Sequence, residues 1–219
     1  MRSRKLTVLV VSGALLVTST GVAVAQVIGA NAELKDTDGN EVGTAEFAEG
    51  PGGVATTVNL QPGQKAVGPG EHGVHIHEKG DCSSSDFKSA GEHFNPQGKE
   101  HGFENPKGPH AGDLPDIKVN EDGSAAAQAK TDRVTLSKGE TSLFDSDGSA
   151  LVIHTKADDF KTDPSGESGD RQVCGEIQKT SQQLPASGGI NIIPLAALLG
   201  VAGLCAGILL WRRVFHSQY

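Results

Sequence analysis

The sequence predicts an all-β domain, a small sandwich or barrel of about eight short strands. Short runs that alternate in polarity or are rich in β-branched residues recur along the middle of the chain. The chain holds 29 glycines and only 4% aromatic residues, a composition that suits many short strands and turns. Outside its two ends, no segment shows a convincing amphipathic helical pattern.

The eight expected strands follow one another with turn sequences between them. They lie near Ala32–Leu34, Glu41–Phe47, Gly53–Leu60, Gly73–His77, Ile117–Val119, Ala125–Ala129, Ala150–His154 and Gln172–Ile177. Glycine-containing turns mark the breaks before the second, third, sixth and seventh of them, at Asp38-Gly39, Pro51-Gly52, Asp122-Gly123 and Asp147-Gly148. Two long segments, 79–115 and 155–171, interrupt the series, and loops of that length in a compact domain are usually functional.

Four of the eight histidines form a set that is suited to copper. His75 and His77 make an H-x-H pair, and in an extended segment both imidazoles lie on one face because strand side chains alternate. His93 and the distant His154 complete four nitrogen ligands. If the apolar residues between these histidines fill the core, the metal site lies on the outer wall of the barrel, under the two long loops.

A second set of ligands shares one histidine with the first. His101, His110 and Asp113 lie in a Gly/Pro-rich stretch that can fold around a metal, with His93 as the fourth ligand. Three histidines and one aspartate make the closed, tetrahedral shell that holds structural zinc. One imidazole serves both metals only if both of its nitrogens are deprotonated, so His93 is expected to bridge them as an imidazolate.

The segments around these residues also resemble a known family. In order, HIHEKGDC, SAGEHFNP, KEHGF, GPHAGDLP, ALVIHTKADD and DRQVCGEI resemble the signature segments of copper/zinc superoxide dismutases, especially the exported bacterial type. The resemblance runs from about Ala30 to Ile177, and every metal-ligand position of the family holds the expected residue type. It implies an eight-stranded Greek-key β-barrel or sandwich, with two long loops covering a copper and zinc site that converts superoxide to oxygen and hydrogen peroxide.

The resemblance also implies roles for two further residues and for His93. Arg171 matches the active-site arginine that attracts and orients the superoxide anion. His93 is expected to leave copper on reduction and to take up a proton for the second half of the reaction. Asp158 matches the carboxylate that accepts hydrogen bonds from His75 and His101.

Cys82 and Cys174 are the only cysteines of the domain, and in the family the matching pair forms a disulfide. By the chain-entropy model, closing a loop of this length stabilises the fold by roughly 4–5 kcal/mol. An exported setting permits such a bond.

The N-terminal residues 1–25 are typical of a signal peptide. Arg2, Arg4 and Lys5 precede an apolar stretch, and Ala23-Val24-Ala25 form a small-residue cleavage site before Gln26. Cleavage after Ala32, or retention of the segment as an anchor, is the alternative. The superoxide dismutase-like domain is therefore expected to span residues 26–180.

The C-terminal region resembles a sortase cell-wall sorting signal. Residues 181–189 form a linker with the motif Leu184, Pro185, Ala186, Ser187 and Gly188, in which serine replaces the usual threonine. An uncharged stretch at 190–211 is long enough to span a bilayer, and the basic tail 212–219 follows it. The expected partners are sortase and peptidoglycan, with a plain membrane anchor as the alternative. Either arrangement places the domain outside the cell.

The charge of the exported part argues against some partners. Five of the 19 basic residues lie near the chain ends, so Gln26 to Gly189 holds 14 basic and 27 acidic residues, a net charge of about −13. This charge disfavours nucleic acid and anionic lipid. Two non-enzymatic alternatives remain, a surface protein that binds copper and zinc without catalysis and an adhesion domain. A homodimer is compatible with the sequence.

Overall fold

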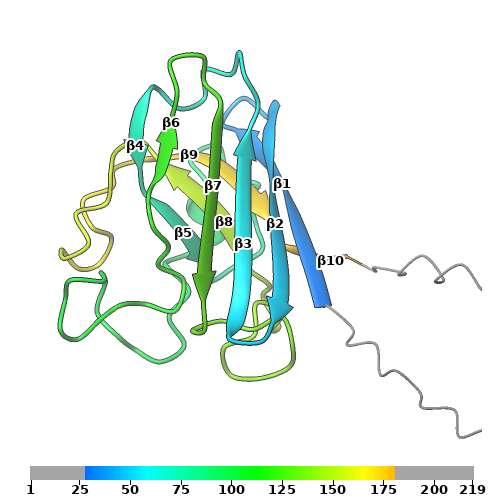
Figure 1. Ribbon diagram of the computed structural model, residues 1–219, viewed down its shortest axis with the longest axis vertical. Helices are drawn as coiled ribbons and strands as arrows, with labels where there is room; N and C mark the ends of the chain where they lie inside the picture. The colour runs from blue at the N-terminus through cyan, green and yellow to red at the C-terminus, as the bar shows by residue number, and fades with distance from the viewer. Residues whose placement is uncertain (1–27, 181–219) are drawn as a thin grey trace, which may run out of the picture.

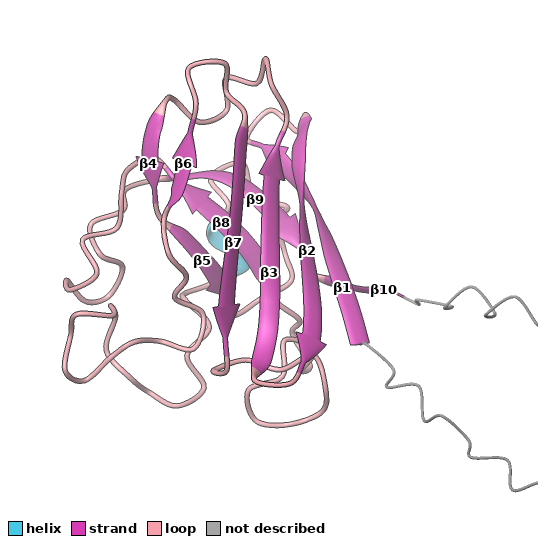
Figure 2. Cartoon of the chain, in the orientation of Figure 1, coloured by secondary structure: helices cyan, strands magenta, loops and turns pink. Residues whose placement is uncertain are grey.

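Antiparallel strands dominate the computed structural model, which describes residues 28–180 (Figures 1 and 2). The strands are β1 (Ile28–Asp36), β2 (Glu41–Gly50), β3 (Gly53–Leu60), β4 (Gly70–His72), β5 (Val74–His77), β6 (Ile117–Val119), β7 (Ala125–Thr131), β8 (Ala150–His154), β9 (Arg171–Glu176) and β10 (Gln178–Thr180). Within the described range, the helical structure is one 3-10 turn, Lys88–Ala90. The predicted all-β class is confirmed.

One curled, eight-stranded sheet forms the body of the domain. Its strands follow the order β5-β8-β9-β1-β2-β3-β7, β10 pairs with β1, and β4 and β6 form a separate two-stranded sheet. The pairing of β9 with β1 brings together strands from opposite ends of the described segment. Because of this pairing, Gly29 of β1 lies opposite Thr180 of β10, so both ends of the described segment leave the same side of the domain (Figure 1).

All eight expected strands are present, and the structure adds β4 and β10. Each added strand has three residues, GEH and QKT, and neither has an apolar alternation that could reveal it. β1 begins at Ile28, earlier than the expected start at Ala32, and Ala30 already pairs with Phe47 of β2. The polar and small residues at the start of β1 concealed this extension.

The core lies inside the curl of the sheet, where side chains alternate as predicted. Leu34 of β1, Val42 of β2 and Val54 of β3 are fully buried there. Ile76 of β5 and Leu151 of β8 join them from the opposite wall. Burying a side chain of this size contributes about 1.5–3 kcal/mol, which makes this interdigitated core the main support of the barrel.

β5 and β8 are buried on both faces, and this double burial creates the site. His75 and His77 of β5 and His154 of β8 point away from the core, yet they are 0–3% exposed. The first long loop (78–116) and the second long loop (155–170) cover them, on the left of the view in Figure 1. The predicted placement of these histidines on the outer wall, under the two loops, is confirmed.

A disulfide and loop-to-loop hydrogen bonds hold the cover in place. Cys82 of the first long loop is bonded to Cys174 of β9, as the family resemblance implied. The two loops meet where the backbone N–H of Glu104 donates to the carbonyl oxygen of Phe160 at 2.9 Å. Both covering loops are therefore tied to the barrel or to each other.

Candidate metal centre

Four buried imidazole nitrogens from separate parts of the chain converge beneath the loops. They belong to the first set, which consists of His75, His77, His93 and His154, and their candidate ligand atoms lie within 4.8 Å of one another. Nδ1 of His75 and Nε2 of the other three have no hydrogen-bond partner within residues 28–180. Because leaving buried polar atoms unpaired is costly, this cradle fits a metal ion that accepts four nitrogen ligands.

The opposite nitrogens of three of these rings are held by neighbouring oxygens. His77 Nδ1 donates to the carbonyl oxygen of Gly91 at 3.0 Å, and His154 Nδ1 donates to that of Gly169 at 3.1 Å. His75 Nε2 donates to Asp158 Oδ2 at 2.8 Å. A neutral imidazole that donates through one nitrogen presents a lone pair on the other, so each ring is oriented toward the common centre.

Burial keeps the imidazole rings of His75 and His154 neutral. It lowers the pKa of His75 to about 3, with a further contribution from the neighbouring His93. Burial likewise lowers the pKa of His154 to about 4, against the hydrogen bond to Gly169. At neutral pH both rings therefore have a free lone pair, which ligation requires.

A second set of atoms, from His93, His101, His110 and Asp113, meets on the other side of His93. Asp113 Oδ1 lies 3.1 Å from Nδ1 of His93 and of His101 and 3.4 Å from that of His110, and Nδ1 of His93 and of His110 are 3.4 Å apart. Metal–nitrogen bonds of about 2.0 Å in a tetrahedron give edges of about 3.3 Å, so these spacings fit a zinc shell. His75 also lies close to this group. It belongs to the first set, because its Nε2 is taken by Asp158.

Two buried carboxylates organise the second set. Asp113 Oδ2 accepts the backbone N–H groups of Gly102 at 3.0 Å and His110 at 2.9 Å, which leaves Oδ1 for the centre. Asp158 joins the sets, since its oxygens accept from His75 Nε2 at 2.8 Å and His101 Nε2 at 2.9 Å. Burial alone would raise the pKa of both carboxyls, but hydrogen bonds, chiefly from the histidines, hold each pKa below its ordinary value.

Arg171 lies beside the first set, at the start of β9. Its guanidinium donates to the carbonyl oxygens of Phe87 at 2.7 Å and Gly91 at 2.6 Å. It lines a surface pocket whose other charged residues are Asp86, Lys88, Glu92 and Asp170. The rim of this pocket therefore holds three acidic residues beside two basic ones, Lys88 and Arg171.

Some residues that support the site were not predicted. Asp163 Oδ1 accepts the backbone N–H of His101 at 2.7 Å, and the Asp116 carboxylate accepts that of Asp158 at 3.2 and 3.3 Å. Burial, opposed by that hydrogen bond and reinforced by the charge of Asp158, raises the pKa of Asp116 to about 6. In the sequence, nothing separates these acids from ordinary solvated loop residues.

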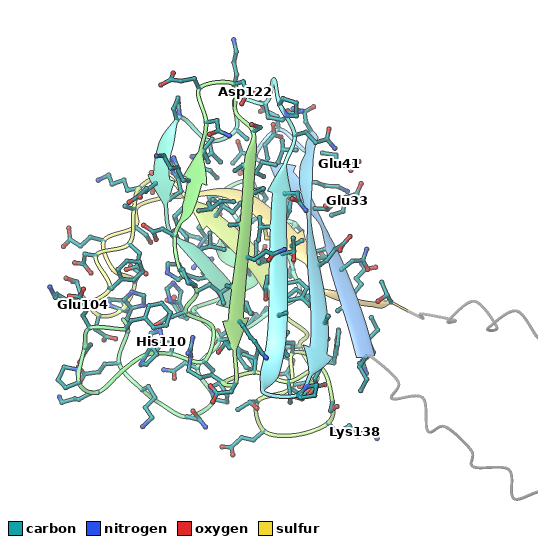
Figure 3. All side chains as sticks on the ribbon, in the orientation of Figure 1. Glu33, Glu41, Glu104, His110, Asp122 and Lys138 are labelled. Carbon is teal, nitrogen blue, oxygen red and sulfur yellow. A yellow bond between two sulfur atoms is a disulfide. The ribbon has the colours of Figure 1, made fainter. Side chains whose placement is uncertain are left out.

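Of the predicted site residues, the structure brings together all seven ligands, Asp158, Arg171 and the disulfide. The sorting motif Leu184–Gly188 lies outside the described residues. His110 is labelled in Figure 3, where it lies among the loops on the left of the view, away from β1 and β2.

Comparison with known proteins agrees with this geometry. The family model described as copper/zinc superoxide dismutase matches residues 41–177. The Cu-Zn superoxide dismutase 2 of Aquifex aeolicus is 46% identical over 171 residues, which cover 77% of this chain and 96% of that protein. A superoxide dismutase-like protein of Bacillus subtilis is 42% identical over 151 residues, or 68% of this chain and 76% of that protein.

Solved structures show the same relationship. The crystal structure of a SOD-like protein from Bacillus subtilis superposes with a TM-score of 0.61 at 41% identity, covering 68% of this chain and 97% of that one. The Cu/Zn superoxide dismutase from Brucella abortus superposes with a TM-score of 0.55 at 28% identity, covering 68% of this chain and 99% of that one. Sequence, fold and converging ligands agree: the chain belongs to the copper/zinc superoxide dismutase family, and copper and zinc are its cofactors.

Proposed function

We propose that this protein is an active superoxide dismutase that works outside the cell. Four buried imidazole nitrogens that lack partners within residues 28–180, beside an arginine that lines an open pocket, carry the proposal. The first set would hold copper and the second set zinc, with His93 as the shared ligand. The reaction converts two superoxide anions and two protons into one oxygen molecule and one hydrogen peroxide molecule.

The residues of the site divide the work of this reaction. Bound copper would supply the one-electron redox chemistry, and zinc, which is not redox-active, would keep the loops and His93 in place. Arg171 binds and orients the anion through its fixed positive charge. His93 is the proton carrier, because its Nε2 can hold a proton whenever that nitrogen is not coordinated. Asp158 keeps the rings of His75 and His101 aligned throughout.

A non-catalytic metal-binding role is the second candidate, because some close relatives carry only the name superoxide dismutase-like. The complete first set together with Arg171 favours catalysis, since metal storage needs no group that guides an anion. Elemental analysis and a dismutation assay on the metal-reconstituted, full-length protein distinguish the two. We expect one copper, one zinc and rapid dismutation. A protein that binds both metals but shows no dismutation would favour the storage role. A protein that binds only zinc when copper is supplied in excess would contradict the proposed copper site.

Single substitutions test the assignment of the two sets. His154→Ala should chiefly lower copper content, whereas His110→Ala should chiefly lower zinc content. His93→Ala should lower both, because that ring belongs to both sets. Lys130→Met is a useful control, since in the described part of the chain the Lys130 ammonium donates to the carbonyl oxygen of Pro51 at 2.9 Å and to no ligand residue. Equal loss of both metals from every variant would contradict the division into two sets.

The location outside the cell rests on the disulfide and on the two chain ends. The bond between Cys82 and Cys174 is typical of exported proteins. Cleavage of a signal peptide after residue 25 is compatible with the fold, whereas cleavage after Ala32 would remove the part of β1 that pairs with β2 and β10. The proposed linker, span and basic tail at 181–189, 190–211 and 212–219 lie beyond the described residues. Within residues 28–180, no helix is long and apolar enough to cross a membrane.

A further inference from the structure

Arg133 connects the loop after β7 to the segment that carries three of the second-set ligands. Its Nε donates to the carbonyl oxygen of His110 at 3.2 Å, and one terminal nitrogen donates to that of Asp113 at 2.7 Å. The centre of the guanidinium also lies 5.1 Å from the middle of the Phe103 ring, two residues after His101. Arg133 thus contacts the backbone of two proposed ligands, His110 and Asp113, and a side chain two residues from a third, His101.

The backbone on both sides of Arg133 is anchored to the barrel. Thr131, the last residue of β7, pairs with Val54 of β3, and its Oγ1 accepts the backbone N–H of Arg133 at 3.1 Å. On the other side, the Glu49 carboxylate accepts the N–H of Leu136 at 3.2 Å and the hydroxyl of Ser137 at 2.8 Å. The guanidinium therefore projects from a rigid base, which is the condition for positioning another group accurately.

Holding the carbonyl oxygens of His110 and Asp113 fixes the separation of two ligands before any metal binds. These residues lie three apart, and the N–H of His110 already donates to Asp113 Oδ2 at 2.9 Å. The planar guanidinium can donate to both carbonyls at once from a single orientation, and a lysine ammonium at the same place cannot reproduce that fork.

We propose that Arg133 is a positioning residue for zinc, which preorganises the His110–Asp113 segment and thereby sets how tightly zinc is held. The inference rests on the proposed assignment of His110 and Asp113 as zinc ligands. Within residues 28–180, the Arg133 side chain donates hydrogen bonds to His110 and Asp113 and to no residue of the first set, so copper should depend on it much less.

Zinc affinity of the metal-free, full-length protein, measured by competition with a chromogenic chelator, tests the proposal. Arg133→Met removes the donors and keeps an aliphatic stem, and it should lower zinc affinity by about 10- to 100-fold, as the loss of a group that orients a ligand usually does. Arg133→Lys should recover only part of this loss. Copper affinity should stay close to that of the wild type. Cobalt(II), bound in place of zinc, should show altered visible absorption bands in Arg133→Met, because the ligand geometry relaxes.

Lys130→Met is the matched control. Lys130 is also a cation that donates to a backbone carbonyl, that of Pro51 at 2.9 Å, but this carbonyl belongs to the turn between β2 and β3, which holds no ligand. Unchanged zinc affinity and cobalt spectra in Arg133→Met would overturn the proposal. So would full recovery by Arg133→Lys, or a loss of zinc, copper and unfolding free energy in equal measure. If the wild type bound neither zinc nor cobalt(II), both the proposed function and the role of Arg133 would be rejected. The outcomes above, in contrast, reject only the role of Arg133.

Discussion

Arg171 and His77 donate to the same acceptor, the carbonyl oxygen of Gly91, at 2.6 and 3.0 Å. The shared carbonyl places the guanidinium next to the first set and orients the His77 ring, so that Nε2 faces the other nitrogens. A loop residue without a side chain thus aligns Arg171 with a candidate copper ligand. The position of Arg171 relative to the metal is set by backbone geometry.

Substitutions of Arg171 should separate its charge from its shape. Arg171→Lys keeps the positive charge and loses the planar fork that reaches both Phe87 and Gly91, so dismutation should slow modestly. Arg171→Glu should slow it much further, because a negative charge repels the anion, while both metals stay bound. Stopped-flow dismutation rates and metal analysis measure both effects. Nearly full activity of Arg171→Glu with both metals in place would show that Arg171 does not guide the substrate.

The acidic rim of the Arg171 pocket should limit the rate at low salt. Glu92 lines this pocket with Arg171, so Glu92→Gln should speed dismutation by removing a charge that repels superoxide. Added salt should shrink the gain, since screening acts over about 8–10 Å at moderate ionic strength. Glu41→Gln is the control for net charge, because it changes that charge equally but Glu41 does not line the pocket. Equal gains from the two variants would implicate overall charge instead of the rim.

Asp116 should make stability depend on pH in a narrow window. Its pKa rises from 3.8 to about 6 on folding, so between these values the unfolded chain binds fewer protons and stability falls as pH rises. Asp116→Asn keeps an acceptor for the N–H of Asp158 and removes the charge. The variant should therefore gain stability relative to the wild type from pH 4 to pH 6, as measured by urea unfolding of metal-free protein. A constant difference across this range would refute the role of the charge.

Asp116→Ala, in contrast, should loosen both metal sites through Asp158. Without the acceptor, the Asp158 backbone loses the hydrogen bond that helps to hold its carboxylate between His75 and His101. Metal affinity should fall by about tenfold or more in chelator competition. Asp159→Ala is the control, because within residues 28–180 the Asp159 carboxylate accepts only from its own loop, at Lys161 and Thr162. The same affinity in both variants would exclude a positioning role for Asp116.

The anchoring proposal predicts how the protein is released from cells. Muramidase should release it if the LPASG motif is cut and joined to the wall, whereas detergent alone should release it if the 190–211 stretch remains as a membrane anchor. Deleting Leu184 onward should send active enzyme into the medium, because every ligand precedes Thr180. Retention of the truncated protein on the cell would show that another segment anchors it.

The sequence by itself determined the residues that carry the chemistry and the faces on which they lie. Strand alternation is a local property, so the opposite orientation of Ile76 and His77 in β5 follows directly from their neighbouring positions in the chain. The ligand types, the shared role of His93 and the matching pair of cysteines were likewise visible as residue identities and spacings.

Only the tertiary structure decided which nitrogen of each ring faces the centre and which groups hold the ligands in place. The contacts of Arg133 with His110 and of Asp116 with Asp158 join segments 23 and 42 residues apart. Such contacts depend on how the two long loops fold back over β5 and β8, and no local periodicity encodes that path. An aspartate or arginine in a loop has the same appearance in the sequence whether it faces solvent or a buried carbonyl or amide, because its surroundings come from distant parts of the chain.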